Sequence, residues 1–180
     1  MKFLTRAECE SFFAKLGIDR DGLIAGSRGA DRYKTLEAFY TPNLVADRMG
    51  GFIAAGQGRH AECLVWCADL VFGDRSLEPH PPRAWLDYAK WRKAMGEPRV
   101  LYDAPGHLFE PQEGDLLARV VAFAIRLGWD AYVAAKPNKF VLRVCHDDYL
   151  TIYARSTPSG LLDDLRTLGL EPKRADLRRR

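Results

Sequence analysis

The sequence predicts an α+β fold, in which a helical N-terminal half packs with a small C-terminal antiparallel β-meander flanked by helices. Three observations support this prediction. A capping box stands near the N-terminus, apolar residues recur at helical spacing through residues 115–127, and the apolar period changes to two through residues 130–153. Because the period changes after Gly128, we expect the strands on its C-terminal side.

The N-terminal half carries patterns typical of helices. Thr5 and Glu8 fit a capping box, which opens a helix that ends near Leu16. Because their apolar residues recur on one helical face or follow a helix-start signal, further helices are predicted for 33–40, 41–49, 60–72 and 83–95. The glycine-rich residues 50–58 are expected to connect two helices, and residues 104–113 to form a loop.

The C-terminal half predicts a helix, three strands and a second helix. Residues 115–127 form a largely apolar helix that ends at Gly128, and turns at 136–139 and 146–148 separate the strands. These turns set a register in which Tyr132 faces Arg143 and Arg143 faces Thr151. Alternation then gives an apolar sheet face and a mixed face. The final helix is predicted for residues 159–168, ending at Gly169.

Length and charge favour one domain with a basic end. We expect residues 1–170 to form a single compact α+β domain, with one candidate sub-boundary near 78–82 between a helical segment 1–77 and an α-β-β-β-α segment 98–170. Residues 171–180 hold five Lys or Arg and two acidic residues, whereas the rest of the chain holds 22 of each sign. The positive charge therefore belongs to a tail, expected to be mobile or to contact an acidic partner or phosphates.

Composition favours a soluble, cytoplasmic protein without a membrane partner. No apolar run approaches the roughly 20 residues that span a bilayer, and the first residues lack the apolar core of a signal peptide. The four cysteines lie inside apolar patterns, which is typical of reduced, buried thiols.

Motifs that carry chemistry are scarce. On a helix, His60, Cys63 and Cys67 would share one side and suit zinc, but no fourth ligand is evident and an apolar core is the favoured interpretation. Residues 50–58 lack the spacing of phosphate loops and dinucleotide-binding loops. His107 and the turn His146–Asp148 accompany no catalytic motif. We therefore predict no catalytic residue, no metal and no cofactor.

Two groups of residues are predicted to bind a partner. On the mixed sheet face, the register places the Arg143 guanidinium among Tyr132, Tyr149 and Tyr153. On the helix 83–95, Trp85 and Trp91 belong to an aromatic stripe. Two structural alternatives stay open: the tyrosines only stabilise the sheet or are covered by N-terminal helices, and the tryptophans pack on the segment 63–72.

The favoured function is a small protein-interaction module of the adaptor, regulator or toxin-neutralising immunity type, whose partner is another protein. One alternative is an enzyme or ligand-binding domain with a pocket between the two halves that draws on His107, His146 and Asp148. Another is a nucleic-acid-binding protein that uses the basic tail and the Tyr/Arg sheet face, which the neutral charge of the remaining chain disfavours.

Overall fold

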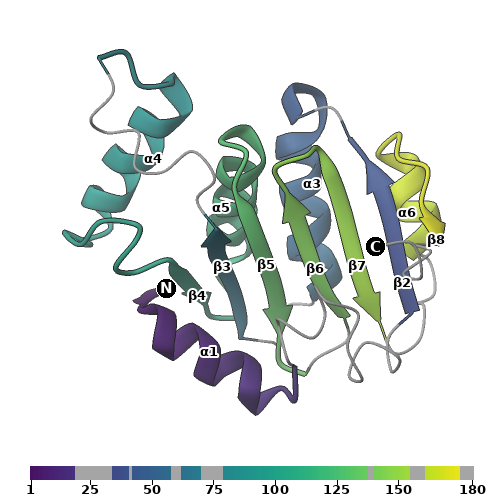
Figure 1. The fold of residues 1–180 in the computed structure, drawn as a ribbon, viewed down its shortest axis with the longest axis horizontal. Helices are drawn as coiled ribbons and strands as arrows, with labels where there is room; N and C mark the ends of the chain where they lie inside the picture. Colours follow the sequence, from purple (N-terminus) through teal and green to yellow (C-terminus); the bar gives the residue numbers. More distant parts are fainter. Residues whose placement is uncertain are drawn as a thin grey trace.

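The computed structural model describes residues 1–18, 34–40, 42–57, 62–69, 79–137, 140–154 and 161–174. These residues form an antiparallel sheet with helices on both faces (Figure 1). The strand order is β1-β4-β3-β5-β6-β7-β2-β8. The strands are β1 (Lys2–Leu4), β2 (Lys34–Phe39), β3 (Cys63–Asp69), β4 (Gly106–Phe109), β5 (Asp130–Ala135), β6 (Phe140–Cys145), β7 (Tyr149–Ala154) and β8 (Lys173–Arg174). The helices are α1 (Arg6–Lys15), α3 (Pro42–Gln57), α4 (Arg83–Ala94), α5 (Gly114–Arg126) and α6 (Leu161–Thr167).

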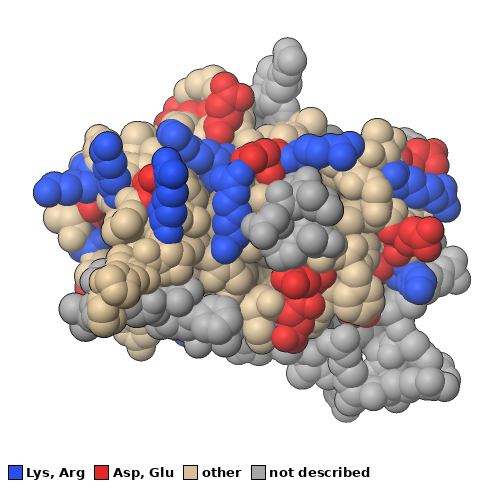
Figure 2. Space-filling model, turned by 90° about the horizontal axis from the view of Figure 1, so that it is seen from above, with Lys and Arg blue, Asp and Glu red and all other residues tan. Residues whose placement is uncertain are grey.

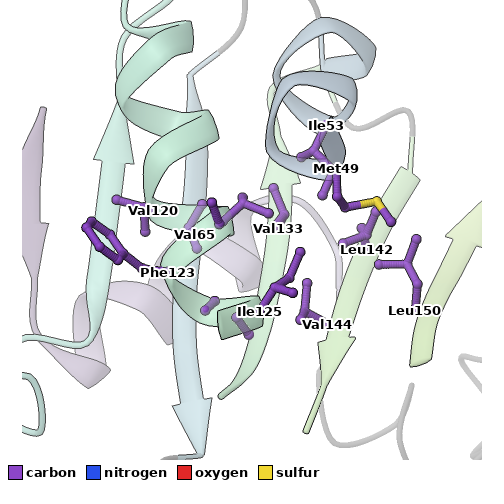
Figure 3. Close-up of a cluster of buried hydrophobic side chains, with 14 of the residues drawn as sticks. Met49, Ile53, Val65, Val120, Phe123, Ile125, Val133, Leu142, Val144 and Leu150 are labelled. Carbon is purple, nitrogen blue, oxygen red and sulfur yellow. The ribbon is translucent and has the colours of Figure 1, made fainter. Parts of the chain in front are cut away.

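Helices α3 and α5 cover one face of the sheet, and their apolar side chains interlock with those of the central strands. In Figure 3, Met49 and Ile53 descend from α3 and meet Leu142 and Leu150 of the sheet, while Phe123 comes from α5. All of these side chains are buried. Burying a side chain of this size contributes about 1.5–3 kcal/mol, so this apolar layer is the main source of stability.

A glycine lets α3 and α5 approach closely. A Cβ atom added at Gly50 would lie 2.3 Å from the carbonyl oxygen of Ala118 on α5, a distance that no side chain tolerates. Gly50 lies inside α3, so the prediction that residues 50–58 connect two helices is wrong for 50–57. The glycine is needed for helix packing, where a glycine in a helix otherwise costs about 1 kcal/mol relative to alanine.

The predicted C-terminal meander is confirmed, including its register. Tyr132 pairs with Arg143 on β5 and β6, and Arg143 pairs with Thr151 on β6 and β7. The long helix before the strands is α5, and Gly128 after it has a φ of 61°, which the chain needs to leave the helix. The final helix is α6, followed by Gly169 with a φ of 81°.

The helical N-terminal half is confirmed only in part, because strands are interspersed with its helices. The predicted helices near 5–16, 41–49 and 83–95 correspond to α1, α3 and α4. The segments 33–40 and 60–72 were expected to be helices, but their described residues form β2 and β3. The segment 104–113, expected to be a loop, contains β4. The protein is therefore α+β, with one sheet that takes strands from both sides of residues 78–82.

The physical reason for the error at β3 is burial on both sides of the sheet. Leu64 and Trp66 pack with α1, while Val65 belongs to the α3 and α5 layer. A strand buried on both faces gives an unbroken apolar run, which sequence periodicity cannot distinguish from a buried helix. In β2, Leu36 and Ala38 alternate with Thr35 and Glu37, which is strand periodicity in a short segment.

The basic C-terminal segment contributes a short edge strand. Lys173 and Arg174 form β8 and pair with Glu37 and Leu36 of β2, while residues 175–180 lie outside the described part. Within the described ranges, none of the helices is both long and apolar enough to cross a membrane.

Candidate functional site

The predicted contact between Arg143 and the tyrosines exists, and it includes a carboxylate that the sequence analysis did not consider. Arg143 donates from Nη2 to Oδ2 of Asp130 over 3.1 Å and from Nη1 to the hydroxyl of Tyr149 over 3.4 Å. Its guanidinium carbon also lies 5.9 Å from the centre of the Tyr149 ring. Burial alone would lower the pKa of Arg143, but the neighbouring Tyr132 and Asp130 raise it, so the side chain stays charged.

Asp130 links Arg143 to the turn between β6 and β7. Its Oδ1 accepts the backbone N–H of His146 over 3.0 Å and lies 3.1 Å from His146 Nδ1. Burial would raise the pKa of Asp130, but the bonds from His146 and the charge of Arg143 outweigh it and hold the pKa below its usual range. Asp130 is therefore an ionised carboxylate in a nearly water-free position.

Cys145 completes this group of polar side chains. Its Sγ lies 4.0 Å from His146 Nδ1 and 3.8 Å from Oδ2 of Asp147. Burial raises the pKa of the Cys145 thiol, which disfavours its use as a nucleophile at neutral pH. We call Asp130, Arg143, Cys145 and His146 the sheet-end cluster.

The tyrosines around Arg143 are buried, so the mixed sheet face is not an exposed docking surface there. Tyr132, Tyr149 and Tyr153 are 1%, 8% and 4% exposed. The ring of Tyr132 meets Phe13 of α1 edge to face, with ring centres 6.3 Å apart. The alternative that an N-terminal helix covers part of this face agrees with that contact, and the binding role of these residues stays a prediction.

Trp85 and Trp91 of α4 are also largely buried, at 5% and 7% exposure. Trp85 contacts Trp129, which follows α5, and Trp91 contacts Phe123 of α5 and stacks on His107 of β4. The aromatic stripe therefore packs against α5 and β4, and the segment 63–72 that it was expected to meet is β3 in its described residues.

A buried arginine attaches the segment after α4 to the helix. Arg92 donates to the carbonyl oxygens of Arg99, Val100 and Ala104 at 3.1, 3.3 and 2.9 Å. It also donates to the hydroxyl of Tyr88 at 2.8 Å, and that hydroxyl is 2.9 Å from His107 Nε2. Because the Tyr88 oxygen accepts from Arg92, its own hydrogen is free to donate to a neutral His107.

The electrostatics of this network keep His107 uncharged. The side chain is fully buried, and burial together with the positive charge of Arg92 lowers the pKa of His107 to about 3. A histidine with this pKa cannot act as a general base or acid near pH 7.

The surface that Arg92 shapes is a groove between α4 and the segment 96–101. The groove has a volume of about 580 Å³. Its lining is mainly apolar and includes Trp85, Ala89, Lys93, Val100 and Leu101. We call it the α4 groove. A second cleft lies between α4 and α5, and Trp91 contributes to its lining.

The residues of the predicted enzyme-type pocket do not meet. His107 is buried beside Tyr88 near α4, whereas His146 and Asp148 lie in the turn between β6 and β7. None of the three lines either of the two pockets described above. Cys63 and Cys67 lie four positions apart on a strand, about 13 Å, so they cannot bind one metal ion; His60 lies outside the described residues.

Sequence reasoning missed Asp130 and Arg92, the two residues that organise these regions. Asp130 is the first residue of β5 and opposes the Cys145 end of β6, which the predicted register already implied. Arg92 stands beside Trp91 in a stripe of mixed polarity, and no sequence signal marks its burial.

Comparison with known proteins gives no relatives: no family model matches the chain, and neither the curated proteins nor the solved structures contain a match.

Proposed function

We propose that this protein is a small protein-interaction module of the adaptor, regulator or immunity type, and that it binds its partner through the α4 groove. The observation that carries the proposal is the position of the exposed apolar side chains. Of the five large hydrophobic side chains exposed in the described residues, four lie between positions 86 and 102, namely Leu86, Met95, Val100 and Tyr102. Val100 lines the groove, and Leu86, Met95 and Tyr102 each follow or precede a lining residue in the sequence. Exposed apolar groups concentrated near a groove are typical of interaction sites.

The form of the groove fits one large apolar side chain of a partner. Trp85, Ala89 and Lys93 line the groove from one face of α4, because their spacing of four residues places them along one side of a helix. Opposite them is the segment 96–101, held by Arg92. Because Arg92 donates hydrogen bonds to main-chain carbonyls of this segment, the segment is held in place before a partner binds. A groove that is already formed reduces the entropy cost of binding.

The charge around the groove favours an acidic partner. Helix α4 contains four basic residues, of which Arg92 is buried, and one acidic residue. Figure 2 shows Lys and Arg side chains gathered over the left half of the surface, where Figure 1 places α4 and α5. The carboxylate of Glu97, which also lines the groove, is already bonded to Arg99 at 2.6 Å. The proposed ligand is therefore a peptide segment with a bulky apolar residue next to Asp or Glu.

A displayed peptide library tests this proposal with a defined probe. Peptides selected on the full chain are expected to combine an aromatic or large aliphatic residue with neighbouring carboxylates. Ala89→Glu fills the groove and adds a repelling charge, so it should weaken binding of the selected peptide more than about tenfold. Fluorescence polarisation measures the affinity.

The matched control is Phe39→Glu, because Phe39 is 70% exposed on β2 and is, among the residues that the structure describes, the one large exposed hydrophobic outside residues 86–102. This change should leave the affinity unaltered. Equal weakening by both substitutions, or selected peptides without acidic residues, would overturn the proposal.

A further inference from the structure

The sheet-end cluster brings together three types of metal-binding group from two strands and a turn. An oxygen of Asp130, Sγ of Cys145 and Nδ1 of His146 all lie within 4.8 Å of one another. Asp130 starts β5 and Cys145 ends β6, and Ala131 pairs with Val144 one position further in, so the pairing of the strands brings these residues together. The arrangement therefore rests on the sheet and not on a surface loop alone.

The separations are close to those in a tetrahedral zinc site. Zinc binds sulfur, nitrogen and oxygen at about 2.0–2.3 Å, so its ligand atoms lie about 3.3–3.8 Å apart. Here His146 Nδ1 is 3.1 Å from Asp130 Oδ1 and 4.0 Å from Cys145 Sγ. The third separation, between the Asp130 oxygen and Cys145 Sγ, is at most 4.8 Å, so shifts of about 1 Å would bring the three atoms around one ion.

The same turn offers a carboxylate as fourth ligand, that of Asp147, which lies beside Cys145 and His146. Asp147 Oδ2 lies 3.8 Å from Cys145 Sγ, and Asp147 Oδ1 lies 3.4 Å from His146 Nε2. Its side chain is 66% exposed and that of His146 is 29% exposed, whereas Asp130 and Cys145 are buried. An ion can therefore enter from the turn while two ligands already lie inside the protein.

Arg143 supports this use of Asp130. Its bond goes to Oδ2, and this leaves Oδ1 directed at His146. Hydrogen bonds to the second oxygen of a ligating carboxylate commonly orient it in metal sites. We propose that Asp130, Cys145 and His146 bind zinc, with the carboxylate of Asp147 as fourth ligand. On binding, the ion takes the place of the thiol proton of Cys145, which leaves to solvent, while His146 binds through the lone pair of Nδ1 in the neutral tautomer that carries its hydrogen on Nε2.

Cobalt substitution tests the site directly. The full chain, stripped of metal by chelator dialysis, is titrated with Co²⁺ alone, and absorption is recorded. We expect one equivalent to produce the thiolate-to-cobalt charge-transfer band and intense visible bands of a tetrahedral site, and zinc to displace them. A chain that shows no such bands would overturn the proposal.

Variants assign the ligands. Cys145→Ala should lose the charge-transfer band, and His146→Gln should lower cobalt affinity at least about tenfold. Cys63→Ala is the control, since Cys63 is buried in the apolar layer under α5 and should keep the band. Asp147→Asn changes an exposed side chain, so it leaves the fold intact and should weaken cobalt binding. A charge-transfer band that survives in Cys145→Ala or is lost in Cys63→Ala would contradict the assignment of Cys145. An unchanged cobalt affinity in Asp147→Asn would contradict the assignment of Asp147.

Discussion

Two arginines, the buried Arg92 and the partly buried Arg143, organise two regions of this protein in different ways. Arg143 pairs with an ionised carboxylate, and that carboxylate also holds His146. Arg92 has no direct carboxylate contact in the described residues and donates to main-chain carbonyls and to Tyr88. The first arrangement joins titratable side chains at one end of the sheet, whereas the second shapes the backbone of a surface groove.

The difference shows how one residue type supports two kinds of site. A charge pair fixes the positions of side chains that can hold an ion, and a charge bonded to carbonyl dipoles fixes the course of the main chain. The sheet-end cluster should therefore respond to changes of charge, and the α4 groove to changes that release the segment after α4.

The largest effect is expected when Arg143 loses its partner. Asp130→Ala leaves a largely buried guanidinium without its counter-charge, which should lower the free energy of unfolding by about 3–4 kcal/mol in urea denaturation. The matched control is Asp47→Ala, because Asp47 pairs with Arg126 at the surface and is 75% exposed. The control should cost at most about 1 kcal/mol. Similar losses in both variants would contradict the distinction between a buried and an exposed pair.

Removing the second arginine should have a somewhat smaller effect. Arg92→Met keeps the apolar stem and leaves several acceptors without a donor, so the free energy of unfolding should fall by about 3 kcal/mol. Lys93→Met alters the exposed neighbouring residue and should stay within about 0.5 kcal/mol of wild type. Hydrogen exchange in residues 99–104 should accelerate only in the Arg92 variant, and unaltered exchange there would show that Arg92 does not hold this segment.

The smallest effect concerns pH near the α4 groove. The pKa of His107 is about 3 in the folded protein, compared with about 6.5 in an unfolded chain. Because the folded pKa is the lower one, the unfolded chain binds the extra proton, and stability present above pH 6.5 is lost as pH falls. From pH 7.5 to pH 5 the loss through His107 should be about 2 kcal/mol at about 1.4 kcal/mol per pH unit.

A variant isolates this contribution from those of other groups. His107→Gln retains an acceptor for Tyr88 but does not titrate, so its free energy of unfolding should fall about 2 kcal/mol less over the same pH interval. Denaturant titrations at several pH values measure the difference. Identical pH profiles for the wild type and the variant would show that His107 binds its proton equally well in the folded and the unfolded protein, which would contradict the lowered pKa.

Much of the C-terminal half was predictable because its signals are local. A long amphipathic helix, two turns and strict alternation define α5 and the meander, and Tyr132, Arg143 and Thr151 pair as expected. The N-terminal strands were not predictable in the same way. Their residues become strands through pairing with partners far along the chain, as β2 does with β7 and β3 with β5.

The candidate sites were predictable only where the register determined them. Alternation correctly grouped Arg143 with its tyrosines, but burial of that face depends in part on packing with α1, which no local pattern reports. The groove depends on Arg92 turning inward to reach carbonyls up to twelve residues away. In the sequence, a polar residue beside an aromatic stripe is as consistent with an exposed side chain as with one that is buried and bonded to main-chain carbonyls.

The proposed binding surface is tested most directly by mapping hydrogen exchange over the whole chain with and without a selected acidic, aromatic-containing peptide. We expect the peptide to slow exchange of amides within residues 85–101, which border the α4 groove, and to leave those of β2 unaltered. Slowed exchange at β2 or in the β6–β7 turn, with none in residues 85–101, would contradict the account.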